Sequence, residues 1–280
     1  METFDTDKEI TWCPGCGNFA ILKAMKKAFA SQGLAPKDLL LVAGIGQAGK
    51  TPHYIQGNLL HGLHGRALAM ATGAKIANHN LNIVVSSGDG DCYGEGGNHF
   101  LAAIRRNVDL TLLVHNNQVY GLTKGQASPT SPLGMKTKLQ AHGTTSPPFN
   151  PIALALTAGA GFVAKGFSGN QDQLSGLIVA AMSYKGFAMI DILQPCVSFN
   201  KINTHLWYKE RVFDLAPGHD VTDFQRALAL SLMDEEKIPT GILYKKEGSC
   251  FHEKLAVLKN MPLVEYPFAK DQMGDILGQT

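Results

Sequence analysis

The sequence predicts an α/β protein built on a doubly wound, mostly parallel sheet. Short continuous apolar runs, typical of strands buried on both faces, alternate with longer segments whose apolar residues recur at helical spacing. Two of these runs, at residues 83–85 and 110–115, are each followed directly by polar residues. The carboxyl ends of parallel strands form one edge, where such sheets bind their ligands.

Each expected element follows from these two patterns. The predicted strands cover residues 39–43, 83–85, 110–115, 161–167, 187–193 and 241–244. The predicted helices cover residues 19–29, 67–77, 151–158, 171–184 and 223–233, and one more separates the second and third strands. We expect residues 1–215 to form the main domain and residues 216–280 to form a C-terminal extension without a motif of its own.

Composition excludes several classes of protein. A net charge of +2 with scattered basic residues indicates no nucleic-acid partner. No apolar run reaches the roughly 18 residues of a membrane span, and the acidic, polar N-terminus does not resemble a signal peptide, so a cytoplasmic protein is expected. Five widely spaced cysteines do not suggest a disulfide framework; ligands or buried thiols are more typical.

A candidate metal site lies at the ends of two predicted strands. Gly88-Asp89-Gly90 follows the strand at 83–85, and Asn117 follows the strand at 110–115. Their side chains should face one crevice. A carboxylate, an amide and a backbone carbonyl are hard oxygen donors that half-fill an octahedron, which suits Mg²⁺ holding a diphosphate. The alternative is a tight Gly-Asp turn with an Asn cap.

A second candidate site begins at Cys13-Pro14-Gly15-Cys16, just before the first predicted helix. This spacing brings two sulfurs to one centre near backbone amides. It is typical of a redox dithiol, half a zinc site or half an iron-sulfur site. Zinc is less favoured because the chain has no second CxxC. Cys196, after the strand at 187–193, is a further candidate ligand.

The motifs together resemble a known family. GDG, a spacer and NN resemble the thiamine diphosphate motif, and GDGD…GGNH…RRN…NNQVYGLTKGQASPTS resembles the β subunit of 2-oxoacid:ferredoxin oxidoreductases. The resemblance extends from about Trp12 to Arg211. It implies a thiamine diphosphate-binding fold and the oxidative decarboxylation of a 2-oxoacid with coenzyme A to acyl-CoA and CO₂. Electrons would pass through an iron-sulfur cluster to ferredoxin, and the reaction could also run in reverse.

The resemblance also implies roles for individual residues around the diphosphate. Asp89, Asn117 and the carbonyl of Val119 would bind Mg²⁺. The residues expected against the cofactor are Gly46, Gln47, His64, Gly88, Gly90, Asp91, Asn117 and Thr123. For His64 the alternative is a capping side chain beside a surface arginine.

The resemblance assigns Cys13, Cys16 and Cys196 to a 4Fe-4S cluster. The family's fourth cysteine directly follows a GIG turn, where this chain has Gln47. We therefore expect a different fourth ligand, a three-iron cluster or no cluster. Cys92, which follows GDGD, and Cys250 are the remaining thiols that could replace the missing ligand, and Cys92, expected beside the diphosphate, is the better candidate of the two. A small buried or partly exposed thiol is the alternative for each.

Substrate choice is predicted from the loop after NN. His64, Thr123 and Lys124 are expected at the reacting centre. Relatives with Gly in place of Lys124 act on pyruvate, and an ammonium there could pair with the distal carboxylate of 2-oxoglutarate. A solvated loop lysine is the alternative.

The implied partners are an α subunit carrying the pyrimidine-binding domain, ferredoxin, the 2-oxoacid and coenzyme A, in a dimer of αβ heterodimers. Without the α subunit the chain should be inactive. Two other functions remain open: a non-redox thiamine diphosphate decarboxylase or carboligase subunit, which would need no CxxC, and a zinc-stabilised nucleotide-binding module.

Overall fold

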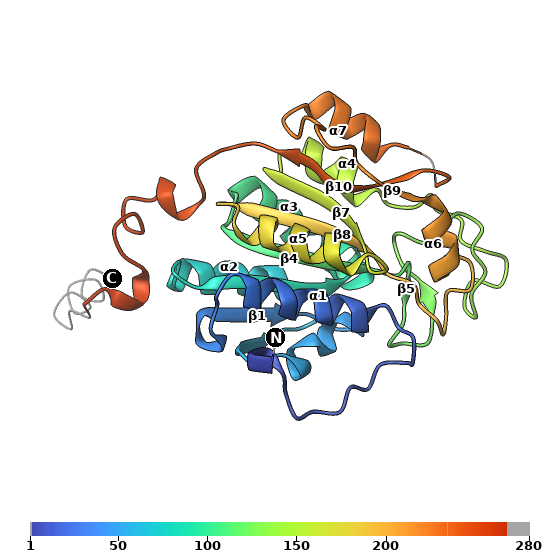
Figure 1. Ribbon diagram of the computed structural model, residues 1–280, viewed down its shortest axis with the longest axis horizontal. Helices are drawn as coiled ribbons and strands as arrows, with labels where there is room; N and C mark the ends of the chain where they lie inside the picture. Colours follow the sequence, from blue (N-terminus) through green and yellow to red (C-terminus); the bar gives the residue numbers. More distant parts are fainter. Residues whose placement is uncertain (1, 234, 268–280) are drawn as a thin grey trace, which may run out of the picture.

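The computed structural model describes residues 2–233 and 235–267 and confirms the predicted α/β class (Figure 1). One eight-stranded sheet has the order β2-β1-β3-β4-β8-β7-β10-β9. All its neighbouring strands are parallel except β10, which runs antiparallel to β7. The strands are β1 (Leu39–Ala43), β2 (Asn58–His61), β3 (Asn82–Gly88), β4 (Leu110–Asn116), β7 (Phe162–Phe167), β8 (Phe187–Leu193), β9 (Val212–Asp214) and β10 (Ile238–Lys245).

Helices cover both faces of the sheet. They are α1 (Asn18–Ser31), α2 (Ala67–Ala77), α3 (Gly97–Arg106), α4 (Pro151–Thr157), α5 (Gln171–Met182), α6 (His205–Arg211) and α7 (Phe224–Ser231). The apolar sides of α1 and α5 pack on one face, and those of α2, α3, α4 and α7 pack on the other. The sheet is therefore doubly wound, as predicted.

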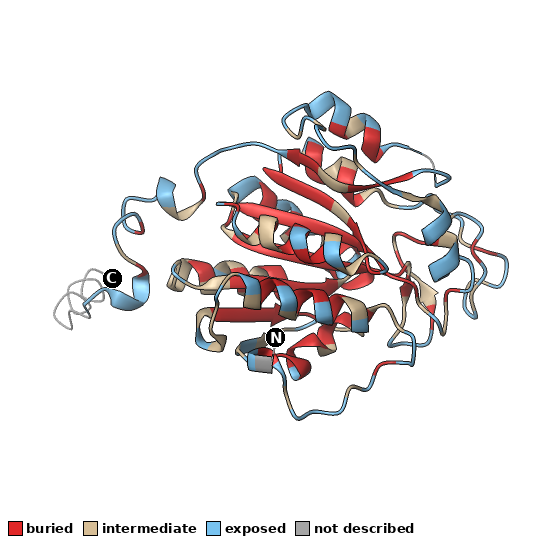
Figure 2. Cartoon of the chain, viewed as in Figure 1, coloured by how far each residue is buried: buried red, intermediate tan, exposed pale blue. Residues whose placement is uncertain are grey.

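The central strands are predominantly apolar because both faces of the sheet are covered. Every residue of β1, β4 and β8 is buried, and Figure 2 shows the buried residues concentrated in the sheet. Strands buried on both sides do not alternate apolar and polar residues, so apolar residues dominate their sequences.

Short edge and loop elements were not predicted. β2 is an edge strand whose residues are mostly exposed, and it therefore lacks a continuous buried run. A small antiparallel hairpin, β5 (Val119–Tyr120) and β6 (Gln126–Ala127), follows β4. Short 3-10 helices occupy Glu2–Phe4, Pro36–Asp38, Ala48–Tyr54, His252–Lys254 and Leu263–Glu265, and a π-helical turn occupies Gly90–Glu95.

The predicted C-terminal extension contributes to the main sheet. β10 pairs with β7 on one side and with β9 on the other, across the predicted boundary between residues 215 and 216. That boundary stays a prediction. Beyond Lys245 the chain forms an arm that runs away from β5 and α6 (Figure 1). Among the described residues, no helix combines the length and apolar character that a membrane crossing requires.

Candidate active site

A cavity lies at the carboxyl ends of β1, β3 and β4, where an open parallel sheet is expected to bind a ligand. Its lining brings together most of the cofactor-binding residues predicted from the sequence. They are Gly46, Gln47, His64, Gly88, Asp89, Gly90, Asp91, Asn117, Val119 and Thr123. We call this space the cofactor cavity. Lys124 is not part of its lining.

Asp89 is a fully buried carboxylate held by two hydroxyl groups. Ser128 Oγ donates to its Oδ2 at 2.5 Å and Thr130 Oγ1 at 2.7 Å. Burial raises the pKa of Asp89 to about 6, although both hydrogen bonds act in the opposite direction. A bound cation would favour the ionised form and offset this cost. The buried Asp89 carboxylate is therefore more stable with a bound cation than without one.

The two asparagines after β4 have different surroundings. Asn116 is part of the protein's own packing, since its Nδ2 donates to Asp191 and its Oδ1 accepts from Thr130. Asn117 instead lines the cofactor cavity, and its Oδ1 accepts a hydrogen bond from the backbone N–H of Val119 at 3.0 Å. A carboxamide oxygen has a second lone pair, so Asn117 retains the capacity to bind a cation.

Asp91 connects three segments that surround the cavity. Its Oδ1 accepts from the backbone N–H of Ile45 at 3.1 Å and of Gly65 at 2.8 Å, and its Oδ2 accepts from Ser87. Gly44 permits this approach, because a Cβ there would lie 1.9 Å from Oδ2 of Asp91. The carboxylate thus positions the turn after β1 and the loop before α2.

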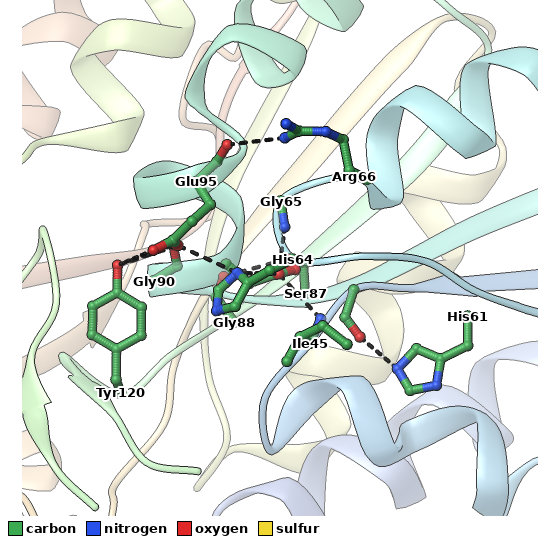
Figure 3. A network of polar contacts seen from close by, with 12 residues as sticks. Ile45, His61, His64, Gly65, Arg66, Ser87, Gly88, Gly90, Glu95 and Tyr120 are labelled. Atoms are coloured by element: carbon green, nitrogen blue, oxygen red, sulfur yellow. Dashed lines mark hydrogen bonds and ion pairs between the residues drawn. The ribbon is translucent and has the colours of Figure 1, made fainter. Parts of the chain in front are cut away.

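His64 lies between two carboxylates at the rim of the same cavity. Its Nδ1 is 2.9 Å from Oδ1 of Asp91 and 3.3 Å from Oε2 of Glu95 (Figure 3). The hydroxyl of Tyr120 donates to the Glu95 carboxylate at 3.3 Å. The two carboxylates hold the imidazole ring at the rim of the cavity.

The three predicted cluster ligands gather around a second space, which we call the thiol cavity. Cys13, Cys16 and Cys196 line it together with Gln47 and Gln194. Ser198 Oγ donates to Cys13 Sγ at 3.1 Å, and Gln194 Nε2 donates to Cys16 Sγ at 3.3 Å. Burial raises the pKa of Cys16 to about 11, and the other two thiols add to the rise. Neither Cys92 nor Cys250 lines this cavity.

The loop after Asn117 places its predicted residues differently. Thr123 lines the cofactor cavity and donates from Oγ1 to Oε1 of Gln126 at 2.5 Å. Lys124 is exposed and has a φ of 81°, a left-handed conformation that is uncommon for a residue with a Cβ.

Several polar residues around these cavities were not predicted as site residues. Ser128 and Thr130 belong to the string QASPTS, which is part of the family resemblance. The sequence did not indicate that their hydroxyl groups donate to Asp89. Gln194 precedes Pro195-Cys196, and its proximity to a candidate ligand was the available signal. The sequence indicated Asn116 only as the first residue of the NN string, without a role of its own.

Two family models match the chain over adjacent segments. Residues 42–192 match the C-terminal TPP-binding domain of thiamine pyrophosphate enzymes. Residues 196–260 match the C-terminal part of the pyruvate ferredoxin oxidoreductase β subunit. The first segment contains all the predicted Mg²⁺ ligands, and the second begins at Cys196.

Similar proteins cover nearly the whole chain. Subunit β of 2-oxoacid:ferredoxin oxidoreductase 2 from Aeropyrum pernix is 44% identical, over 90% of this chain and 85% of the relative. The 2-oxoglutarate synthase subunit KorB from Archaeoglobus fulgidus is 37% identical, over 89% of both. A structure of 2-oxoglutarate:ferredoxin oxidoreductase from Magnetococcus marinus, with 2-oxoglutarate, coenzyme A and succinyl-CoA bound, superposes with a TM-score of 0.92 at 36% identity, covering 98% of this chain and 94% of that one.

The fold, the two adjoining cavities and these similarities lead to one assignment. The chain belongs to the β subunits of the thiamine-dependent 2-oxoacid:ferredoxin oxidoreductases.

Proposed function

We propose that this β subunit acts in the oxidative decarboxylation of 2-oxoglutarate with coenzyme A, yielding an acyl-CoA and CO₂ and sending electrons through an iron-sulfur cluster to ferredoxin. The observation that carries this proposal is that the cofactor cavity and the thiol cavity adjoin. Gln47, Asn117, Gly121 and Gln194 line both. A carbon-centred reaction in one cavity is therefore next to an electron acceptor in the other.

The cofactor cavity would hold thiamine diphosphate and Mg²⁺. Its buried carboxylate, Asp89, lies with Asn117 and the carbonyl of Val119 in one lining, a donor set of the kind that Mg²⁺ prefers. When bound, thiamine diphosphate supplies the carbanion chemistry that a 2-oxoacid needs for loss of CO₂. The chain's own residues would orient the metal through Asp89, and His64, which lines the same cavity, would lie beside the diphosphate.

The thiol cavity would hold the cluster through Cys13, Cys16 and Cys196. A single zinc ion would require ligand atoms on one tetrahedron with bonds of about 2.3 Å. Within the described chain, the only group with three ligand atoms inside 4.8 Å of one another is Cys250, His252 and Glu253, so these three thiols are more widely spaced. That spacing favours a larger metal cluster over zinc, and it argues against the zinc-stabilised nucleotide-binding module.

Gln47 stands at the position where a fourth ligand is expected. Its Oε1 is buried without a hydrogen-bond partner, and the residue lines the thiol cavity. A carboxamide oxygen is a weak ligand for iron compared with a thiolate. We therefore propose three thiolate ligands and a fourth iron that is held less firmly.

The proposed substrate follows from the similar proteins and from the loop after Asn117. The relative from Archaeoglobus fulgidus is a 2-oxoglutarate synthase subunit, and the Magnetococcus marinus structure contains 2-oxoglutarate and coenzyme A. Lys124 lies one residue from Thr123, which lines the cofactor cavity. We propose that its ammonium turns toward the distal carboxylate when the substrate binds.

The proposed enzyme requires an α subunit, and a dimer of αβ heterodimers is the expected assembly. Among the described residues that line the cofactor cavity there is no glutamate, which supports an α subunit as the source of the acid that activates the aminopyrimidine ring. Leu63, next to His64, is 76% exposed, which fits burial under a partner at the rim of this cavity. Ferredoxin would accept the electrons from the thiol-cavity side.

A Cys13→Ser variant of the αβ complex tests the proposal. We expect it to lose ferredoxin reduction while it still releases CO₂ from 2-oxoglutarate when an artificial oxidant replaces ferredoxin. Global unfolding of the variant would support a structural metal instead. A wild-type complex that lacks iron but still decarboxylates would identify a non-redox decarboxylase or carboligase.

A further inference from the structure

Gln194 occupies the wall between the cofactor cavity and the thiol cavity. It lines both spaces, and only 2% of its surface is exposed. Its backbone N–H donates to the carbonyl oxygen of Asn116 at 2.9 Å, which fixes the main chain at the end of β8. Gly17 provides the space for the side chain, because a Cβ there would lie 2.6 Å from Cγ of Gln194. The carboxamide is therefore held in one place by packing from two elements.

The two ends of this carboxamide differ. Its Nε2 donates to Cys16 Sγ at 3.3 Å, whereas its Oε1 is buried and has no hydrogen-bond partner in the described chain. Buried carbonyl oxygens are nearly always paired, and leaving one unpaired is unfavourable. Gln194 lines the cofactor cavity, so a hydrogen-bond donor on a molecule that fills this cavity is a candidate partner for Oε1.

A hydrogen bond at one end of an amide changes the strength of the bond at the other. When Oε1 accepts a hydrogen bond, the amide becomes more polarised and Nε2 becomes a stronger donor. N–H donors to the sulfurs of an iron-sulfur cluster stabilise its reduced form, because that form carries more negative charge. Occupation of the cofactor cavity can thereby raise the reduction potential at the thiol cavity.

We propose that Gln194 is a positioning residue that couples the two sites: it donates to the Cys16 thiolate, accepts a hydrogen bond from the bound cofactor, and so raises the cluster's reduction potential when the cofactor is in place. This inference rests on the proposed function, since it needs both groups. The coupling is reciprocal, so reduction of the cluster also changes the affinity of the cofactor cavity for its ligand.

Gln47 provides a contrast within the same wall. Gln47 also lines both cavities, and its Oε1 has no hydrogen-bond partner among the described residues. Its backbone carbonyl, however, accepts a hydrogen bond from Trp12 Nε1 at 2.8 Å. No hydrogen bond joins its side chain to a thiol among the described residues, in contrast to Gln194. Coupling through hydrogen bonds is therefore assigned to Gln194.

The test is a potentiometric titration of the anaerobically purified αβ complex, followed by the cluster's EPR signal, with and without thiamine diphosphate and Mg²⁺. In the wild type we expect the midpoint to rise when the cofactor is added. Gln194→Met keeps the shape but removes both polar ends, so its midpoint should be lower and should no longer respond to the cofactor. Gln194→Glu places a negative charge beside the thiolate and should lower the midpoint further.

Gln32→Met is the matched control, because Gln32 also donates from Nε2, but to the carbonyl of Val179 at 3.2 Å. It should keep the wild-type midpoint and response. A Gln194→Met complex with normal iron, the wild-type midpoint and the wild-type response would overturn the inference. Loss of iron from both Gln194 variants would also overturn it, since the side chain would then be needed to hold the cluster. A wild-type complex without iron would instead remove the proposed function itself.

Discussion

Ser128 donates a 2.5 Å hydrogen bond to Oδ2 of Asp89, a residue 39 positions earlier in the chain. Thr130 adds a second bond to the same oxygen. The loop that follows the β5–β6 hairpin therefore reaches back to the candidate metal site and fixes the direction of its carboxylate. Residues that orient a metal ligand in this way affect metal affinity without touching the ion.

We predict that replacing Ser128 by Ala weakens the binding of Mg²⁺ and thiamine diphosphate by about 10- to 100-fold, the usual effect of removing a partner of a metal ligand. Isothermal titration calorimetry at several Mg²⁺ concentrations measures this change. Ser183→Ala is the control, because Ser183 donates to a backbone carbonyl at the end of α5. Equal affinities in the two variants would show that the loop does not orient Asp89.

Replacing Asp89 by Asn should have opposite effects on binding and stability. Binding of thiamine diphosphate with Mg²⁺ should be lost, because a neutral amide replaces the charged ligand. The cofactor-free protein should gain up to about 3 kcal/mol in unfolding free energy at pH 7, since burial raises the pKa of Asp89 to about 6 and the charged form is penalised. Chemical denaturation measures the gain.

The control for Asp89→Asn is Asp172→Asn, which alters a fully exposed carboxylate paired with Lys27 on the outer surface of the protein. It should leave cofactor binding unchanged. An Asp89→Asn variant that still binds Mg²⁺ normally would contradict the assignment of Asp89 as a ligand.

His115 should make the fold sensitive to acid. It is buried between Asn18 Oδ1 at 2.7 Å and Ser86 Oγ at 3.1 Å, and burial lowers its pKa to about 3. Below the unfolded-state pKa of about 6.5, the unfolded chain binds a proton that the folded chain does not. His115 should therefore cost about 1.4 kcal/mol of unfolding free energy per pH unit as the pH falls from 6.5 toward 3.

Urea denaturation between pH 7 and pH 4 tests this expectation. His115→Gln should flatten the dependence of unfolding free energy on pH. His142→Gln, at an exposed histidine in the loop before α4, should retain the wild-type dependence. Parallel pH profiles for wild type and His115→Gln would contradict the burial of a neutral imidazole.

Lys124→Gly separates substrate recognition from stability. We expect kcat/KM for 2-oxoglutarate to fall by about 10- to 100-fold, the range for losing a hydrogen bond to a charged group, while activity on pyruvate is unchanged or improved. Stability should not decrease, because Lys124 has a φ of 81°, which glycine adopts without strain. Lys138→Gly, at another exposed lysine in the segment after β6, is the control. Equal losses for both substrates would contradict a role in selectivity.

The sequence predicted the fold where burial imposes a simple pattern. The predominantly apolar runs of β1, β4 and β8 were found because both faces of the sheet are covered. β2 was missed because an exposed edge strand needs no such run. The strand predicted at residues 241–244 is longer in the structure, where β10 runs from Ile238 to Lys245. The sequence provided no prediction of its neighbour β7, because the pattern of one strand does not indicate which strand it pairs with.

The candidate site was predictable only where its residues form a local motif. The GDG and NN strings place Asp89 and Asn117 at neighbouring strand ends, and the structure finds both in one cavity. The partners of those residues are distant in sequence, such as Ser128 for Asp89 and Gln194 for Cys16. Ser128 and Gln194 reach these partners only because the loops after β4 and β8 fold back toward the site, and a single sequence does not show the course of such loops.

The most direct measurement is a low-temperature EPR spectrum of the αβ complex, purified without oxygen, before and after the addition of 2-oxoglutarate and coenzyme A. The account predicts a reduced iron-sulfur signal that appears when both substrates are present and is lost in Cys13→Ser. A silent spectrum from a complex that contains zinc or no iron would contradict electron transfer through the three thiols.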